Sequence, residues 1–222
     1  MAGLTKAEAR TRRAHQLDQL IEAAAHIIER EGIAALRART LAAEVGCALG
    51  AIYNLVADMD EIIIRVNSRT LARLHQAMNV AEAETSGADP VDRLVAFALA
   101  YARFAQNHTP AWRALFEHRM APGSALPEFA VADQMRLFER ILDPVKRLMP
   151  KASDADISLA ARTLFASVHG IVTLDIDEKL LAVPRELQNR QIELAVRWMS
   201  DGIRRRPSSK PEKQARRAAK SR

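Results

Sequence analysis

The 222-residue sequence lacks several features that mark whole classes of protein. It holds one cysteine, Cys47, so it has no disulfide framework. Its longest run of uniformly apolar residues, 94–102, is nine residues long, and a membrane-spanning helix needs about 20. We therefore expect no membrane segment and no membrane partner. The basic N-terminus is followed by a polar, amphipathic segment instead of the apolar core of a secretory signal, which predicts a cytoplasmic protein.

The motifs of the common enzyme classes are also missing. The sequence has no Gly-x-Ser-x-Gly, no glycine-rich phosphate loop and no cysteine pair. Its six histidines are not spaced as helical zinc ligands, which would stand four residues apart. We expect no catalytic residue, no metal site and no cofactor, and we interpret Cys47 as a core residue and not as a redox sensor.

Basic residues are unevenly distributed along the chain. The formal net charge is +6, yet residues 204–222 alone hold nine Lys/Arg and one Glu, so the rest carries a small negative charge. A second basic segment, residues 1–16, holds four cations and one anion: Lys6, Arg10, Arg12, Arg13 and Glu8. Such arms bind polyanions through counterion release, without sequence preference. Nucleic acid is the partner that they fit best, and an anionic membrane surface is the alternative.

Helical periodicity recurs throughout the sequence, and alternating strand patterns are nearly absent. The expected fold class is all-α with about nine helices. Start and stop signals place these helices at about residues 15–31, 38–45, 49–55, 60–83, 90–107, 110–118, 127–150, 154–179 and 185–204. Asp58 and Glu61 have the spacing of a capping box at the start of the fourth helix.

The second and third predicted helices have the pattern of a helix-turn-helix. Gly46 supplies the turn between them, and Ala42 permits the two helices to approach closely. The small apolar core of the motif is expected from Leu41, Val45, Cys47 and Ile52. This spacing is typical of motifs that place their second helix in the major groove of DNA.

On these residues the chain resembles the TetR family of one-component transcriptional regulators. Residues 17–64 carry the resemblance, through Gly-Ile-x-x-Leu from Gly32, Leu-Ala-x-x-x-Gly from Leu41, Ile52-Tyr53, and the long apolar helix that follows. The later Val168-His169-Gly170 also fits. The resemblance implies a DNA-binding domain with a basic arm at 1–60, a ligand-binding and dimerisation domain at 61–203, and a basic disordered tail at 204–222.

The resemblance implies that helix 49–55 contacts a palindromic operator in double-stranded DNA. The expected contact residues are Arg12, Arg13, Arg37, Arg39, Thr40, Leu49, Gly50, Ala51, Tyr53 and Asn54. The chain departs from the family where Arg37 replaces the usual Ser or Thr cap, and where Leu55 and Met59 replace the usual His and Lys. We therefore expect sparse contact with bases and a larger contribution from the basic N-terminal arm.

The resemblance further implies a homodimer in which the last two long helices pair with those of a second copy. The expected interface residues are Ile157, Ala161, Leu164, Val168, Leu187, Leu194 and Trp198. A small-molecule effector, apolar or amphipathic, is expected in a cavity lined by Phe97, Tyr101, Phe104, Trp112, Phe116, His118, Arg119, Met135, Phe138 and His169. Ordinary core packing is the alternative for each of these aromatic side chains.

The hypothesis is a TetR-like repressor that a ligand releases from its operator. Two alternatives come from other classes of protein. One is an architectural DNA binder that is driven by the basic arms and tolerates many sequences. The other is a helical ligand-binding protein or enzyme that does not bind DNA.

Overall fold

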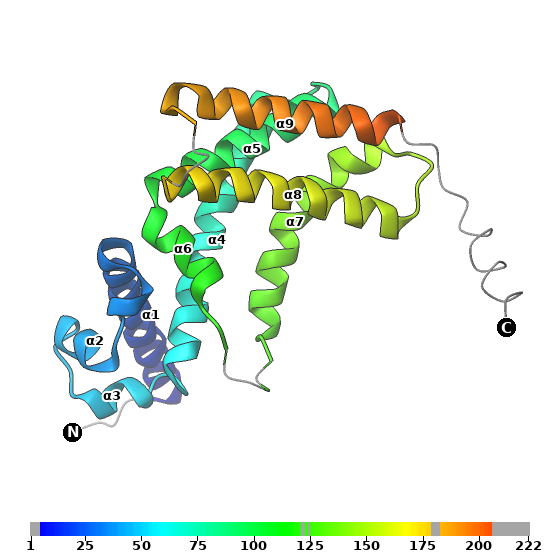
Figure 1. Cartoon of the computed structure of the whole chain (residues 1–222). Coiled ribbons are helices and arrows are strands. Elements are labelled where there is room, and N and C mark those ends of the chain that lie inside the picture. The colour runs from blue at the N-terminus through cyan, green and yellow to red at the C-terminus, as the bar shows by residue number, and fades with distance from the viewer. Residues whose placement is uncertain (1–4, 121–122, 124, 179–182, 206–222) are drawn as a thin grey trace, which may run out of the picture. The chain divides into compact units, whose positions relative to one another are not determined.

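A computed structural model describes residues 5–120, 123, 125–178 and 183–205 of the chain (Figure 1). Within these residues the chain forms nine α-helices and one 3-10 turn, Ile33–Ala35, and no strand, which confirms the all-α fold class. The helices are α1 (Lys6–Glu31), α2 (Ala38–Glu44), α3 (Leu49–Tyr53), α4 (Met59–Glu84), α5 (Pro90–Asn107), α6 (Thr109–Glu117), α7 (Glu128–Leu148), α8 (Asp154–Ile176) and α9 (Arg185–Arg205).

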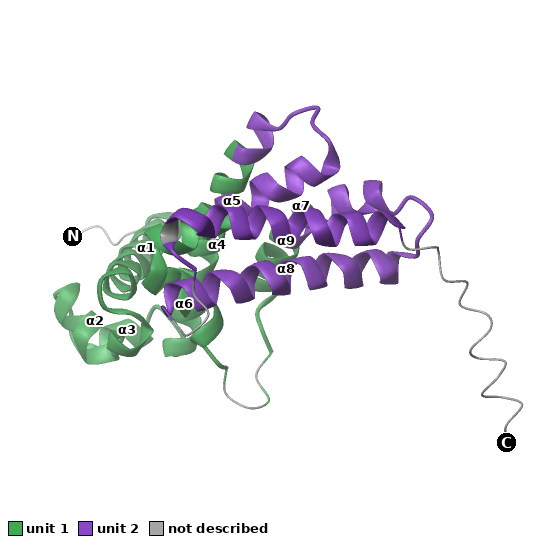
Figure 2. Ribbon diagram, turned by 45° about the horizontal axis from the view of Figure 1, so that its top comes forward, with its two compact units in different colours: residues 1–80, 101–137 green, residues 81–100, 138–222 purple. Residues whose placement is uncertain are grey.

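The chain divides into two compact units, each built from segments that are distant in sequence (Figure 2). The first unit comprises residues 1–80 and 101–137, and the second comprises 81–100 and 138–222. Helices α4, α5 and α7 contribute residues to both. The functional boundaries expected at residues 60 and 203 concern DNA and ligand binding and stay predictions. From residue 206 onward the expected basic tail lies outside the described residues.

The core of the first unit holds the α2–α3 pair against α1, α4 and α6. It includes buried side chains from each helix, among them Ile28, Leu41, Ile52, Ile62 and Ala114. Each large apolar side chain that is fully buried contributes about 1.5–3 kcal/mol to folding. Arginines of α4 add ion pairs to α1: Arg69 pairs with Asp18 and Glu22, and Arg73 pairs with Glu29. The short motif helices are therefore held on a framework of longer ones.

Helix α1 begins nine residues earlier than the predicted start at residue 15. The hydroxyl of Thr5 accepts a hydrogen bond from the Glu8 N–H (3.3 Å), and the Glu8 carboxylate accepts one from the Thr5 N–H (2.7 Å). This capping box satisfies two backbone donors that would otherwise have no partner. The prediction was wrong because it followed apolar periodicity, which begins at Leu17. From Lys6 onward the expected basic arm is helical.

The second unit is built around α8 and α9, which lie side by side (Figures 1 and 2). Arg93 of α5, whose side chain is 11% exposed, pairs with Glu82 at 2.5 Å and with Asp143 at 3.0 Å. At the end of α9, Arg204 pairs with Asp89 at 2.7 Å. Arg204 and Arg205, expected in the tail, therefore belong to α9.

Helix α8 is long and apolar enough to cross a membrane, judged by length and composition alone. Helix α8 contains no long uninterrupted apolar run, because Arg162 and several Ser and Thr residues interrupt its apolar residues. Core helices of globular proteins meet the same criterion when they are mostly buried. Here the chain itself buries 28% of the most apolar window, so α8 presents apolar surface that a single copy does not cover.

Candidate nucleic-acid interface

Helices α2 and α3 form a helix-turn-helix whose turn depends on Gly46. Gly46 has φ +67°, in the left-handed region that favours glycine. The Cys47 N–H donates to the Ala42 carbonyl at 3.0 Å, and the Gly46 N–H donates to the Ala43 carbonyl at 3.3 Å. These two bonds form a Schellman motif, which satisfies the last carbonyls of α2. Leu41 and Ile52 are fully buried beneath the turn, as predicted.

Of the four residues predicted for the motif core, one is exposed and one is only partly buried. Cys47 is exposed, and Val45 is only partly buried against the core. The prediction for Cys47 was wrong, because the residue follows a left-handed glycine and the turn leaves its side chain in solvent. The buried positions are filled instead by Leu36 and Val56, which flank the motif.

The expected DNA-contacting side chains lie mainly on exposed surface of the first unit. Seven of those on and around the motif are exposed: Arg37, Arg39, Thr40, Leu49, Gly50, Tyr53 and Asn54. Ala51 is half-buried. Arg37 precedes α2 and makes no side-chain cap there. Leu55 and Met59 pack against the core, so the two residues that replace the family's polar contacts serve folding.

Arg13 connects the start of α1 to the end of α3. Its Nη2 donates a hydrogen bond to the Asn54 carbonyl at 3.0 Å, at the C-cap of α3. Arg12 is exposed on the same helix. A shallow hollow beside this contact is lined by Arg10, Arg13, Tyr53 and Arg65, among others. Arg10 and Arg65 were not predicted as site residues, since the proximity of α1, α3 and α4 has no local sequence signal.

Glu61 fixes the first turn of α4 beside the motif. Its N–H donates to the Asp58 carboxylate at 2.8 Å, which confirms half of the predicted capping box. Its carboxylate accepts from the Ala57 N–H at 2.8 Å and from the guanidinium of Arg65 at 2.8 and 2.9 Å. Burial acts to raise the pKa of Glu61, but these hydrogen bonds and the charges of Arg65 and Arg13 outweigh it and lower the pKa.

The residues expected to line a ligand cavity fall in both compact units. The first unit contains Tyr101, Phe104, Trp112, Phe116, His118, Arg119 and Met135, and the second contains Phe97, Phe138 and His169. The indole N–H of Trp112 donates to the Tyr101 hydroxyl at 2.9 Å, and the Trp112 ring lies 5.4 Å from that of Phe116. Burial raises the pKa of Tyr101, although the bond from Trp112 opposes it, so the phenol stays neutral.

These residues fall into two groups: some are buried in the core, and others are exposed at the surface. Phe97, Tyr101, Phe104 and Trp112 are buried, whereas Phe116 and Met135 are 45% and 46% exposed. His169 stacks on the Phe165 ring at 5.7 Å, and burial lowers the pKa of this histidine. Ligand binding by these side chains stays a prediction.

Four of the expected dimer-interface residues are buried within the chain: Ile157, Ala161, Leu164 and Val168. In the single chain these four side chains belong to the core, and their contact with a second copy stays a prediction. Helix α8 is apolar on more than one face, so spacing alone did not show which face points inward. Its exposed apolar residues include Leu159 and Leu174. On α9, Leu187 and Trp198 are exposed and Leu194 is half-buried.

Residues 94–198 match the family model of the tetracyclin repressor-like C-terminal domain. A comparison with curated proteins gave no match. Among solved structures, a protein of unknown function from Rhodococcus sp. RHA1 is 25% identical, with a TM-score of 0.64 over 85% of this chain and 93% of that one.

Two further solved structures share the fold at lower identity. BioQ, solved with its double-stranded DNA operator, is 20% identical with a TM-score of 0.57, covering 86% of this chain and 98% of its own. PfmR, a TetR family transcriptional regulator from Thermus thermophilus, is 21% identical with a TM-score of 0.55, covering 87% and 100%. Residues 94–198 of the chain are thus similar to the C-terminal domain of tetracyclin repressor-like proteins, and the chain has the fold of solved TetR family transcriptional regulators.

Proposed function

We propose that the chain is a dimeric DNA-binding repressor that a small apolar or amphipathic molecule releases from a palindromic operator. The observation that carries the proposal is the α2–α3 motif, whose inner side chains are fully buried while its outer face is exposed. A two-fold dimer presents two such motifs to successive major grooves, which accounts for a palindromic site. The operator complex of BioQ supports the same use of the fold.

We propose that this motif makes few contacts with DNA bases. The exposed face of α3 offers the apolar Leu49, the bare backbone of Gly50 and the hydroxyl of Tyr53. Arg39 adds one cation at the first turn of α2. Discrimination between sequences then depends on these few contacts, on the spacing of the two half-sites, and on the shape of the DNA.

Phosphate contacts come from the start of α1 in this proposal. Arg10 and Arg13 line the hollow that also receives Tyr53, and the hydrogen bond from Arg13 to Asn54 fixes α1 beside α3. Cations held in place on a helix lose less conformational entropy on binding than cations on a free arm. This rigid basic surface compensates for the apolar residues at positions 55 and 59.

Release by ligand is a shift of population between two states of the dimer. A ligand that binds the DNA-free state more tightly lowers operator affinity by the ratio of its two affinities. The proposed contacts are the exposed Phe116 and Met135 together with the other predicted ligand residues. A set of compounds that bind the chain without any effect on operator affinity would contradict this switching step.

The test begins with affinity selection of genomic DNA fragments on the full chain, followed by sequencing, at about 50 and 200 mM salt. We expect a single palindromic motif at both salt concentrations. Diffuse recovery that disappears at the higher concentration would instead support a charge-driven architectural binder, and no recovery would support a protein that does not bind DNA.

Variants of the motif then test the contacts on the recovered operator. Arg39→Ala is expected to weaken binding about 10-fold, because one good contact to a base contributes about 1–3 kcal/mol. Tyr53→Phe, which removes only a hydroxyl, should cause a smaller loss. Arg103→Ala is the matched control, since Arg103 is an exposed cation of α5 outside the motif. Equal affinity of all three variants and the wild type would exclude these residues from the interface.

A further inference from the structure

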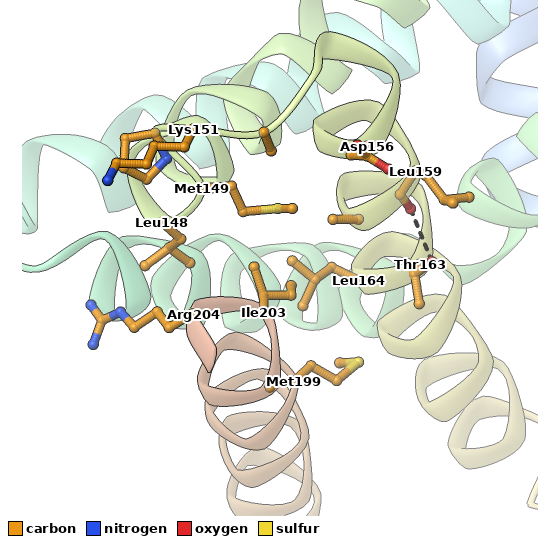
Figure 3. Close-up of a pocket in the computed structure, with 14 residues that line it drawn as sticks. Leu148, Met149, Lys151, Asp156, Leu159, Thr163, Leu164, Met199, Ile203 and Arg204 are labelled. Atoms are coloured by element: carbon orange, nitrogen blue, oxygen red, sulfur yellow. Dashed lines mark hydrogen bonds between the residues drawn. The ribbon is translucent and has the colours of Figure 1, made fainter. Parts of the chain in front are cut away.

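A hollow of about 500 Å³ opens in the second unit where the end of α7, the start of α8 and the end of α9 meet (Figure 3). Apolar side chains form most of its lining, including Met149, Leu164, Met199 and Ile203. None of the residues predicted to bind a small-molecule effector lines it. A hollow of this volume is large enough to accept a bulky aromatic side chain.

Trp198 lies on α9, the helix that contributes Met199 and Gly202 to the hollow, and it is unusually exposed. It is 68% exposed, the highest value among the large hydrophobic side chains that the structure describes. Trp198 and Gly202 are four residues apart on α9 and so lie on the same side of the helix, and Gly202 lines the hollow. On α8, Leu159 lines the hollow and is 61% exposed. A protruding indole and an apolar hollow therefore share one continuous surface.

We propose that, in the dimer, Trp198 of each copy inserts into the hollow of the other. This inference rests on the dimer of the proposed function. A two-fold interface pairs one surface patch with an identical patch, so an adjacent protrusion and hollow are self-complementary and both contacts form together. An aromatic side chain buries about 150–250 Å² on insertion, and tryptophan in a pocket is a frequent anchor of interfaces.

A second copy fits this surface better than a small molecule does. The hollow is lined in part by α8, through the exposed Leu159 among others, and the most apolar window of this helix is 28% buried in the single chain. A bound small molecule would leave that surface and Trp198 uncovered. A partner helix covers the hollow, Leu159 and Trp198 at once, which removes an exposed apolar patch from water.

Two variants test the two halves of the contact without changing the core. Trp198→Ala removes the protruding side chain. Gly202→Leu fills the hollow: a Cβ at Gly202 meets no atom within 4 Å in the single chain, and leucine favours a helix more than glycine by about 1 kcal/mol. Gly50→Leu is the matched control, since a Cβ at Gly50 also meets nothing within 4 Å and Gly50 lies on α3.

Sedimentation equilibrium of the full chain measures the dimer dissociation constant of each variant. Trp198→Ala and Gly202→Leu should each raise it by at least about 30-fold, the size of an interface hot spot. The double variant should add little to either single variant, because both changes remove the same contact. Gly50→Leu should dimerise as the wild type does, and Gly202→Leu should keep or raise the thermal midpoint of the monomer.

Tryptophan fluorescence gives a second readout. Trp112 is 3% exposed and Trp198 is 68% exposed, so a red shift of emission on dilution of the wild type reports Trp198 leaving its partner's hollow. A wild-type dimer in which acrylamide still quenches Trp198 freely, or in which both variants keep wild-type affinity, overturns the inference while the dimer stands. A wild type that is monomeric at every concentration refutes the proposed dimer itself.

Discussion

Among single residues, Glu61 has the largest set of contacts at the start of α4. Its carboxylate joins the loop N–H of Ala57 to the guanidinium of Arg65, one turn further along the helix. Arg65 and Glu61 both line the hollow beside the DNA-binding motif. The charge state of this carboxylate therefore affects both the stability of the first unit and the surface offered to DNA.

Glu61→Gln tests this role through pH. The pKa of Glu61 is lower in the folded chain than its ordinary value of 4.5, so its stabilisation is fully present above that value and is lost as pH falls through the folded pKa. At pH 7 the variant should be less stable by about 1 kcal/mol, and the difference should shrink in acid. Urea unfolding at pH 7 and near pH 4 measures it, with Glu84→Gln as control. A difference that does not change with pH would contradict this account.

Some residues of the motif and its surroundings could be placed from the sequence, and others could not. Leu41 and Ile52 were predictable as core because each lies on the inner face of a regular helix. Cys47 was not, because burial after a left-handed glycine depends on the path of the turn. Arg10 and Arg65 were missed as neighbours of Tyr53, since three helices that are distant in sequence bring them together.

At the scale of elements, the turn of the motif allows a test with two glycines. A Cβ at Gly46 or at Gly50 meets no atom within 4 Å, but Gly46 alone of the two has a positive φ, of +67°. Gly46→Ala should destabilise the chain by about 1 kcal/mol because alanine is strained there, whereas Gly50→Ala should stabilise or leave it unchanged. Thermal unfolding compares them. Equal effects would show that backbone conformation does not set the requirement for glycine at the turn.

The start of α1 is a second element whose role can be isolated. Thr5→Ala removes the capping box and should cost about 1 kcal/mol of helix stability, so that the first turns fray. Arg10 and Arg13 would then lose their fixed positions, and operator affinity should fall several-fold. Hydrogen exchange of amides 6–14 and operator titration measure both effects. Thr11→Ala is the control, because Thr11 bonds only to the Ala7 carbonyl within the helix. Fraying without any loss of affinity would rule out the proposed role of α1.

Elements were predictable where local chemistry determines their ends. Pro90 and Ser153 mark the starts of α5 and α8 as expected, because proline suits a first turn and serine caps one. The start of α1 was predicted too late because its apolar stripe begins at Leu17, more than three turns after the Thr5 cap. The buried face of α8 was not predictable, since Leu159 and Leu164 are equally apolar and only tertiary packing leaves the first exposed and the second buried.

At the scale of the whole molecule, the cations of the C-terminal segment and the residues proposed to recognise the operator lie in different parts of the chain. The proposed base contacts lie on α2 and α3, while residues 206–222 carry seven Lys/Arg and one Glu. Attraction of those cations to phosphate carries no sequence information and weakens with salt. In the proposed function we therefore expect the tail to add affinity for any duplex and the motif to add preference for the operator.

Replacing the seven cations of residues 206–222 with glutamine tests this division while keeping the chain length. We expect operator affinity to fall most at about 50 mM salt and little at about 200 mM, because each lost phosphate contact reduces the slope of log affinity against log salt by about 0.9. The ratio of operator to random-duplex affinity should stay constant or rise, since the tail strengthens both. Fluorescence anisotropy with both duplexes measures it. A collapse of that ratio would mean that the tail itself contributes to sequence recognition.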